Sequence, residues 1–364
     1  MFYRNVLLTL CIVTVPVLTG ATSYAQELDQ RLSLGAELRY RHEMMDVEDR
    51  DMRNRELIRA RLFIDAELDE HLSIGFTLIS GSDDPVAANQ NLTGGFSTKQ
   101  LNIDQAFFDW DPDIVENLSL TGGKMPNPFY LPGRTELVWD TDLRPEGLCL
   151  SYRYTRGMMT LNLATSYLLV EERASDNDAF LFGNQARVSG AFPVASVLLG
   201  LGYYDYENTR GYAPFWDATD GLGNTLTAGN TYRYDYNELE LFSEVSFSGL
   251  PFHQALFFNY VTNLAEHVSE NRGWLAGFTV GRCSTPGTKS FRYIYRELEK
   301  DAVIGRFTDS IFIDGGTDGR GHELNIEYQI AQVSRLCISY LPNQIGIENG
   351  KDFHRVMIDF YFTY

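Results

Sequence analysis

The chain has 364 residues, of which 22% are charged and 44% are hydrophobic, and its formal net charge is −19 at pH 7. Such an acidic chain excludes a protein that binds nucleic acid through basic patches, because phosphate groups would be repelled. Beyond residue 25 the cysteines are Cys149, Cys283 and Cys337. Their odd number and wide spacing exclude a disulfide framework and a zinc site, and we expect no metal and no other cofactor.

The first 25 residues have the pattern of a secretory signal peptide. Arg4 supplies the positive start, Val6–Leu18 is a mainly apolar run, and a small-residue cleavage site ends at Ala25. The apolar run is shorter than the roughly 20 residues that a membrane-spanning helix needs. We therefore expect residues 1–25 to be removed on export and residues 26–364 to form a single domain.

From Leu32 to the end of the chain, apolar and polar residues alternate in short segments with the period of a β-strand. In the first segment, Leu38 and Tyr40 alternate with Arg39 and Arg41. The pattern predicts about sixteen strands, with fourteen or eighteen as alternatives. In chain order the predicted strands are Leu32–His42, Arg55–Leu68, Leu72–Ser80, Leu101–Trp110, Leu118–Met125, Gly147–Tyr154, Met158–Leu169, Ala179–Ala191, Ser196–Tyr206, Tyr234–Phe247, Phe252–Asn263, Gly273–Gly281, Ser290–Leu298, His322–Ile330, Ser334–Leu341 and Phe353–Tyr364.

The last segment ends the chain on an aromatic residue. Phe360, Phe362 and Tyr364 share one face of this strand. Arg355 and Asp359 share the other face. A strand of about ten residues with one apolar and one polar face is the repeating unit of a transmembrane β-barrel. We expect this strand to close such a barrel by pairing with the first one.

The connections between the predicted strands alternate in length. Asp69–His71 and Thr155–Gly157 are short, whereas Gly81–Gln100, Pro126–Glu146 and Glu207–Arg233 are long. Single-chain barrels of the bacterial outer membrane have an even number of strands, short periplasmic turns and long extracellular loops. The alternation therefore predicts an all-β, antiparallel transmembrane barrel with this topology.

A soluble all-β protein would show the same alternation, because periodicity does not tell which face points inward. Aromatic residues favour the membrane barrel, since they cluster near strand ends, where an interfacial girdle would place them. The clusters are Tyr203, Tyr204 and Tyr206, then Tyr232, Tyr234 and Tyr236, and then Phe257, Phe258 and Tyr260.

Several long motifs resemble a family of bacterial outer-membrane porins, and together they span nearly all of residues 26–364. They include LGAELRYRHE (34–43), IRARLFIDAEL (58–68), SGSDDPVAANQNLTGGFSTKQLNIDQAFFDW (80–110), GGKMPNPF (122–129), ELVWDTDLRPEG (136–147), FFNYVTN (257–263), YRELEKDAVIGRFTDS (295–310) and GRGHELNIEYQI (319–330). The resemblance implies a barrel of about sixteen strands that passes small solutes by diffusion. It implies no particular solute and no catalytic residues. Many such barrels end in Phe, whereas this chain ends in Tyr364.

The charges that line a pore set its preference among solutes. The candidate pore-lining residues on polar strand faces are Arg39, Arg41, Arg59, Arg61, Glu37, Asp65, Glu67, Asp104, Arg153 and Arg187. The proline-rich Pro126–Glu146 loop is a candidate constriction, because it is long and bulky enough to fold inward and narrow the bore, and the alternative is an outward lid. Its candidate residues are Tyr130, Arg134, Trp139, Asp140, Asp142 and Glu146. Arginine and carboxylate rows would set a transverse field, unless they pair and neutralise one another.

No H-E-x-x-H motif and no serine–histidine pair at a recognisable spacing occurs, so we expect no enzyme activity. The alternative is a barrel that serves as a scaffold for an enzyme or a surface adhesin. The expected partners are outer-membrane lipid, lipopolysaccharide bridged by divalent cations, small hydrophilic solutes and, by analogy, two further copies in a homotrimer.

Overall fold

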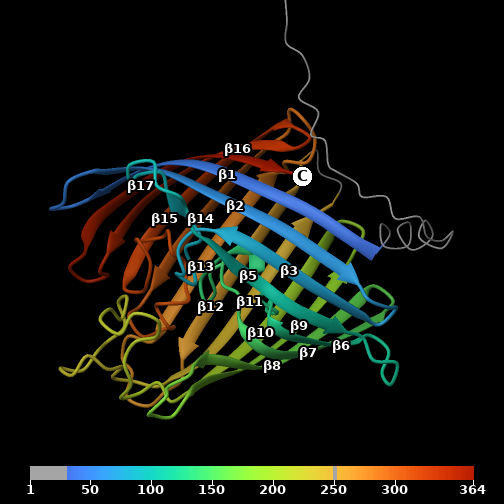
Figure 1. Ribbon diagram of the computed structural model, residues 1–364, viewed down its shortest axis with the longest axis horizontal. Helices are drawn as coiled ribbons and strands as arrows, with labels where there is room; N and C mark the ends of the chain where they lie inside the picture. Colours follow the sequence, from blue (N-terminus) through green and yellow to red (C-terminus); the bar gives the residue numbers. More distant parts are fainter. Residues whose placement is uncertain (1–30, 249–251) are drawn as a thin grey trace, which may run out of the picture.

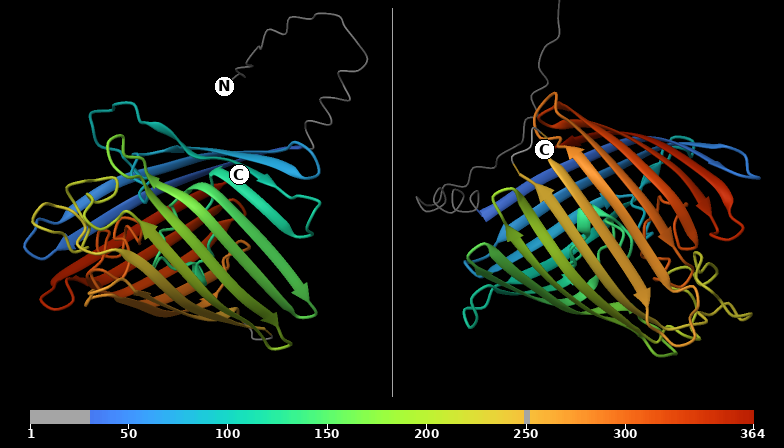
Figure 2. Two further views of the ribbon diagram at one scale, coloured as in Figure 1. Left: turned by 90° about the horizontal axis from the view of Figure 1, so that it is seen from below. Right: turned by 180° about the vertical axis from the view of Figure 1, so that it is seen from behind.

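The computed structural model describes residues 31–248 and 252–364. The predicted signal peptide, residues 1–25, lies outside the described residues. Within the described part, seventeen strands form one sheet that curls into a barrel (Figures 1 and 2). The strands are β1 Leu32–Val47, β2 Arg53–Glu67, β3 Leu72–Ser80, β4 Gln90–Asn91, β5 Leu101–Trp110, β6 Leu118–Lys124, β7 Glu146–Arg156, β8 Met159–Glu171, β9 Ala179–Ala191, β10 Ala195–Glu207, β11 Tyr236–Phe247, β12 Gln254–Asn263, β13 Arg272–Gly281, β14 Lys289–Leu298, β15 Gly319–Ala331, β16 Ser334–Ile345 and β17 Lys351–Thr363.

Sixteen of these strands form the wall of the barrel, each antiparallel to its neighbours. The exception is β4, whose two residues pair only with Leu57 and Ile58 of β2. The last strand closes the ring by pairing with β1 over eleven positions, from Glu37 opposite Thr363 to Val47 opposite Phe353. Beyond this register the Tyr364 N–H donates a hydrogen bond to the Ala36 carbonyl at 2.9 Å. The predicted sixteen-stranded antiparallel barrel and its closure by the terminal strand are confirmed.

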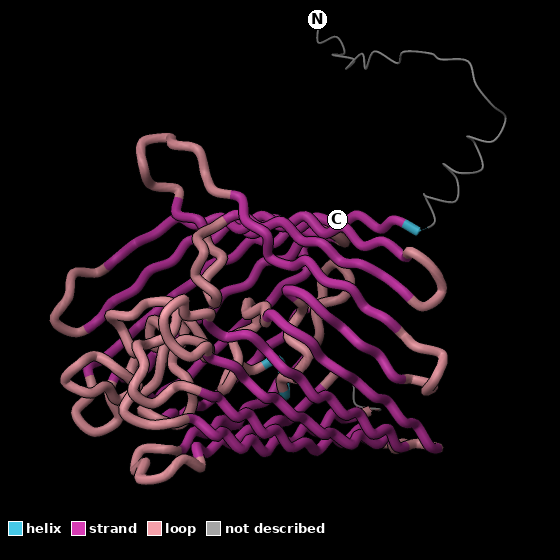
Figure 3. The backbone as a smooth tube through the Cα atoms, turned by 60° about the horizontal axis from the view of Figure 1, so that its bottom comes forward, coloured by secondary structure: helices cyan, strands magenta, loops and turns pink. Residues whose placement is uncertain are grey.

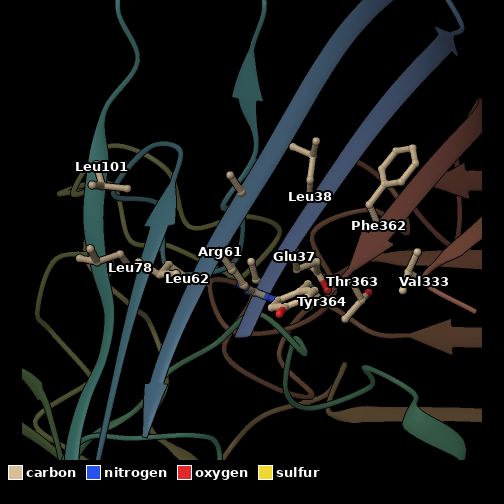
Figure 4. Close-up of a pocket in the computed structure, with 12 residues that line it drawn as sticks. Glu37, Leu38, Arg61, Leu62, Leu78, Leu101, Val333, Phe362, Thr363 and Tyr364 are labelled. Atoms are coloured by element: carbon tan, nitrogen blue, oxygen red, sulfur yellow. The ribbon is translucent and has the colours of Figure 1, made fainter. Parts of the chain in front are cut away.

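The outer surface of the barrel is apolar and its inner surface carries the charges. On β1, Leu34 is 60% exposed, whereas Arg39 is 6% exposed. Figure 4 shows the outer wall where β17, β1, β2, β3 and β5 meet, with Leu38, Leu62 and Phe362 projecting from it. A shallow apolar groove of about 610 Å³ runs along this wall. Exposed leucines beside buried arginines are the reverse of a soluble sandwich and fit a wall that faces lipid.

One part of the aromatic prediction is wrong. Tyr204, Tyr206, Tyr232, Tyr236 and Phe257 do not form a membrane-interface girdle, because they are between 0% and 4% exposed and lie inside the barrel. Tyr204 and Tyr206 share the inward face of β10, and connecting segments cover them. Aromatic rings at strand ends thus serve here as a core within the barrel.

Three strands are at least four residues longer than the sequence predicts: β1, β15, and β16, which continues to Ile345. β1 continues to Val47, because Met45 and Val47 point inward and pack with Phe353 of β17. β15 begins at Gly319, where it pairs with both β14 and β16. The two-residue β4, within the long connection after β3, was not predicted.

Long connections gather at one end of the barrel (Figure 3). Three of them, residues 125–145, 208–235 and 299–318, contribute to a buried cluster that includes Leu137, Phe215 and Val303. The connections 157–158, 192–194 and 332–333, by contrast, are short. Because the long connections pack against one another, the interior at the long-loop end is a packed structure and not an open tube.

In the described part of the chain, no helix has the length and apolar character of a membrane span.

Candidate functional site

The segment 125–145 between β6 and β7, here called the inner loop, lies inside the barrel. Its turn is a 3-10 helix, η1, over Pro132–Arg134, in which Gly133 has a φ of +57°. A Cβ atom at Gly133 would lie 2.4 Å from the Phe257 ring on β12. Glycine is therefore required at position 133 for two reasons: its left-handed backbone conformation and its close approach to the wall.

Aromatic packing holds the middle of the inner loop. The Trp139 ring lies 5.6 Å from the Phe129 ring and 5.0 Å, edge to face, from the Tyr204 ring of β10. Trp139 is 2% exposed. Aromatic contacts of this geometry add to the free energy of burial. The loop is thus tied to the wall by its core as well as by its polar groups.

Hydrogen bonds tie the first half of the inner loop to β9 and β11. The Tyr130 hydroxyl donates to Glu244 at 2.8 Å, and the Gly133 N–H donates to the same carboxylate at 2.9 Å. The Tyr130 N–H donates to the side chain of Gln185 at 2.8 Å. The loop therefore reaches across the interior from β6 to the wall formed by β9, β11 and β12.

The second half of the inner loop returns to β2 through a set of ion pairs. Arg59 donates to both carboxylate oxygens of Asp142, at 2.9 and 3.0 Å, and Arg61 donates to one of them at 2.9 Å. Arg59 also donates to Glu37 of β1 at 2.8 Å. A carboxylate between two guanidinium groups forms strong, charge-assisted hydrogen bonds.

The neighbouring inward arginines of β1 also have acceptors. Arg41 holds Asp359 of β17 in a two-point contact at 2.7 and 3.0 Å. Arg39 donates to Asn89 and lies 3.8 Å from Asp359. The paired arginine wall is our name for Arg39, Arg41, Arg59 and Arg61. These four residues do lie side by side on the inner wall, and carboxylates from the inner loop and from β1 and β17 neutralise them.

The electrostatics of the inner loop follow from these contacts. Burial alone would raise the pKa of Asp142, but the positive charges of Arg59 and Arg61 outweigh it and hold that pKa below its usual range. Asp142 is thus a carboxylate at every physiological pH, and it remains locked to β2.

A second carboxylate group of the inner loop behaves in the opposite way. Oxygen atoms of Glu136, Asp140 and Asp309 lie within 4.8 Å of one another, and Arg296 forms a salt bridge with Asp309 at 2.9 Å. Burial and the neighbouring Asp309 raise the pKa of Glu136 to about 8. Burial and the Glu136 charge likewise raise the pKa of Asp140 well above its usual range. The Glu136 carboxyl group, which lies against segment 299–318, is thus mostly protonated at neutral pH.

Comparison with known families identifies the chain. The family described as "Putative porin" matches residues 36–228 and 225–345, most of the described structure. The chain belongs to this porin family. None of the curated proteins with which the sequence was compared matches it.

Solved structures of porins share the fold of this family member at low sequence identity. Pseudomonas putida OprB, in its high-pH structure, aligns with a TM-score of 0.59 and 9% identity over 94% of this chain and 97% of that one. Salmonella typhi OmpF in complex with daunomycin aligns with a TM-score of 0.55 and 10% identity, over 92% and 97%. The Vibrio cholerae outer membrane protein OmpT lacking loop L8 aligns with a TM-score of 0.51 and 12% identity, over 91% and 100%.

The remaining candidate residues of this porin lie at different depths of the barrel. Asp104 is 3.5 Å from both Arg61 and Arg144, beside the paired arginine wall. Glu146 is the first residue of β7 and pairs with Lys124 at 2.9 Å, so it lies in the wall and not in the inner loop. Three others lie apart from the ion-pair network among the described residues, without a salt bridge: Asp65, Glu67 and Arg134. Arg153 and Arg187, on β7 and β9, also lack one.

Sequence reasoning missed the partners that β14 and segment 299–318 supply to the inner loop. Asp309 and Arg296 face the inner loop, and the Thr308 hydroxyl donates to the Leu137 carbonyl at 2.9 Å. A cavity of about 500 Å³ remains between the inner loop and the wall from β11 round to β1. The sequence marks Arg296 and Asp309 only as charged residues within a motif that resembles the porin family, and it does not show that they meet the inner loop.

Proposed function

We propose that this porin forms a water-filled channel of the bacterial outer membrane, through which small hydrophilic solutes and ions diffuse passively. The observation that carries the proposal is the inversion of the barrel, with leucines on the outside and charged side chains within, as on Leu34 and Arg39. An inner wall that carries charged groups fits a lumen that water and polar solutes enter. Membership in a porin family favours a channel over an enzyme.

The inner loop is proposed to be the constriction of this channel. It spans the interior between β2 and β12, and its anchors to both walls narrow the space available to a solute. Because several loops share the packed interior, we expect a narrow channel with a small conductance for a barrel of this size.

Conductance of the refolded protein in planar bilayers tests this proposal. We expect discrete current steps in KCl, and larger steps after deletion of residues 130–137 from the inner loop. A protein that inserts but gives no current steps would refute the channel. Unchanged steps in the deletion variant would refute the role of the inner loop as the constriction.

Three further features are part of the same proposal. Export through a cleaved signal peptide rests on the pattern of residues 1–25, and contact of the acidic loops with lipopolysaccharide through divalent cations rests on the net charge. Assembly as a homotrimer rests on the family resemblance. Cross-linking of the protein in its native membrane tests the assembly, and a product no larger than a monomer would refute it.

A further inference from the structure

A small cavity of about 240 Å³ lies against β6 to β9, beside the start of the inner loop. Its polar lining comes from the inward faces of these strands and from the turn before β6. The side chains concerned are Asn117, Ser119, Arg153, Asn162, Gln185 and Arg187. No carboxylate group lines this cavity, although the chain as a whole has a net charge of −19.

Two arginines flank one asparagine at the centre of this cavity. Asn162 of β8 lies directly opposite Arg153 of β7 on one side and opposite Arg187 of β9 on the other. Neighbouring strands are about 4.8 Å apart, so the Cα atoms of the two arginines are roughly 10 Å apart. Side chains of this length, projecting from the same face, reach a common point between them.

The side-chain donors of these three residues have no acceptor in the described part of the chain. Among residues 31–248 and 252–364, neither Arg153 nor Arg187 forms a salt bridge, and no side-chain hydrogen bond of Asn162 occurs. The Arg187 guanidinium carbon lies 4.6 Å from the centre of the Tyr130 ring, which supports the flat face of the guanidinium group. Stacking of this kind leaves the N–H edges of arginine free for a ligand.

Two other polar groups of the lining, Ser119 and Gln185, are already occupied by hydrogen bonds within the protein. Ser119 donates to Asp109, and Gln185 holds the backbone of Tyr130 through two hydrogen bonds, at 2.8 and 3.1 Å. These bonds fix the lining beside the inner loop, and the donors free for a ligand come from the Arg153, Asn162 and Arg187 row and from the Asn117 amide at the rim. Such preorganisation favours binding.

We propose that this cavity, the Arg153–Arg187 pocket, binds a small oxyanion such as inorganic phosphate or sulfate. Two guanidinium groups and an amide offer paired N–H donors that match the oxygen atoms of a tetrahedral oxyanion. The cavity is smaller than the roughly 300–1,000 Å³ of sites for drug-sized ligands, so it selects a small ion. A consequence for transport, a local excess of anions in the lumen, rests on the proposed function, whereas binding itself does not.

Equilibrium dialysis of radiolabelled phosphate against the refolded protein in detergent micelles tests the pocket at low ionic strength. We expect saturable binding of one phosphate per chain, and displacement by sulfate. The double variant Arg153→Gln, Arg187→Gln is expected to bind at least about tenfold more weakly, because charge-assisted hydrogen bonds are lost. The matched control is Arg156→Gln, at the exposed last residue of β7 outside the pocket, and it is expected to bind as the unmodified protein does.

Absence of saturable phosphate binding, or equal binding by the double variant, would overturn the inference. The heat-dependent mobility on gels shows whether the double variant folds. If it does not fold, displacement of bound phosphate by sulfate in the unmodified protein is the test, and a lack of displacement would overturn the inference. A protein that binds phosphate but carries no current would refute the proposed channel and leave the pocket standing. A conducting protein without saturable phosphate binding would refute the pocket alone.

Discussion

The paired arginine wall and the Arg153–Arg187 pocket place the same residue type on the same inner surface, yet with opposite surroundings. Arg59 forms salt bridges with Glu37 and Asp142, whereas Arg187 has none among the described residues and lies over the ring of Tyr130. Two neighbouring carboxylates cancel most of the electrostatic attraction that a guanidinium group exerts on a solute anion. A guanidinium group without a carboxylate keeps both its charge and its N–H donors available. The comparison teaches that ion pairing, and not the position of an arginine on a strand, decides whether it organises the protein or meets the solute.

The largest expected difference between the two regions concerns stability. Asp142→Ala leaves Arg59 and Arg61 without their shared partner in a mostly buried site, and we expect a loss of about 3 kcal/mol in the free energy of unfolding. Arg187→Gln removes only a ring contact, and we expect a loss of about 0.5–1 kcal/mol. Urea titration of the protein in lipid vesicles measures both. Equal losses would mean that the two regions do not differ as described.

A smaller effect on the free energy of unfolding is expected from pH, through the Glu136 carboxyl group beside segment 299–318. The pKa of Glu136, about 8 in the folded protein, is above its ordinary value of 4.5. The folded state therefore holds this proton more tightly, and stability falls as pH rises from about 4.5 to 8 and then levels off. Ionised Glu136 would also face Asp140 and Asp309, with Arg296 as the near counter-charge.

Unfolding of the unmodified protein and of Glu136→Gln at pH 6 and pH 9 measures this effect. The unmodified protein should lose stability at pH 9, and the variant should lose less. The paired arginine wall should not contribute in this range, because the pKa of Asp142 is already low. A variant as pH-sensitive as the unmodified protein would refute the role of Glu136.

The smallest expected effect is that of salt. Solvent-accessible charges are screened over about 10 Å at 0.1 M salt and about 3 Å at 1 M. Any anion preference due to the Arg153–Arg187 pocket should therefore fade between these concentrations, while the stability lost in Asp142→Ala should stay nearly constant. A preference that persists at 1 M salt would contradict an origin in exposed, unpaired arginines.

The sequence predicts the wall of this porin well, because a membrane strand repeats one simple pattern. The alternation around Arg39 and Arg41 predicts which side chains face inward, and the ending at Tyr364 predicts the closing strand. The inward orientation of Tyr204 is not predicted, although the sequence carries a signal for it. Tyr204 alternates with Tyr203 along β10, so the two rings must point to opposite faces of the wall, and Tyr204 shares its face with Gly202. A ring near a strand end fits a girdle and an internal core equally well.

The lumen itself is harder to predict, because its contacts join distant parts of the chain. Asp142 meets Arg59 across 83 positions, and no local pattern shows that a carboxylate from a loop will reach β2. The opposite outcome at Arg187, which has no carboxylate partner, is equally invisible. Whether charges on one face pair or stay free depends on where a long loop folds, and the alternating pattern carries no information about that.

The reversal potential in a KCl gradient tests the central claim most directly, in bilayers at 0.1 M mean salt. Two variants are compared with the unmodified protein: the charge-balanced Arg59→Gln, Asp142→Asn, and the unbalanced Arg153→Gln, Arg187→Gln. We predict that the first leaves the preference between chloride and potassium nearly unchanged, and that the second shifts it towards potassium. A shift in the first variant and none in the second would contradict the account, because selectivity would then reside in the paired arginines.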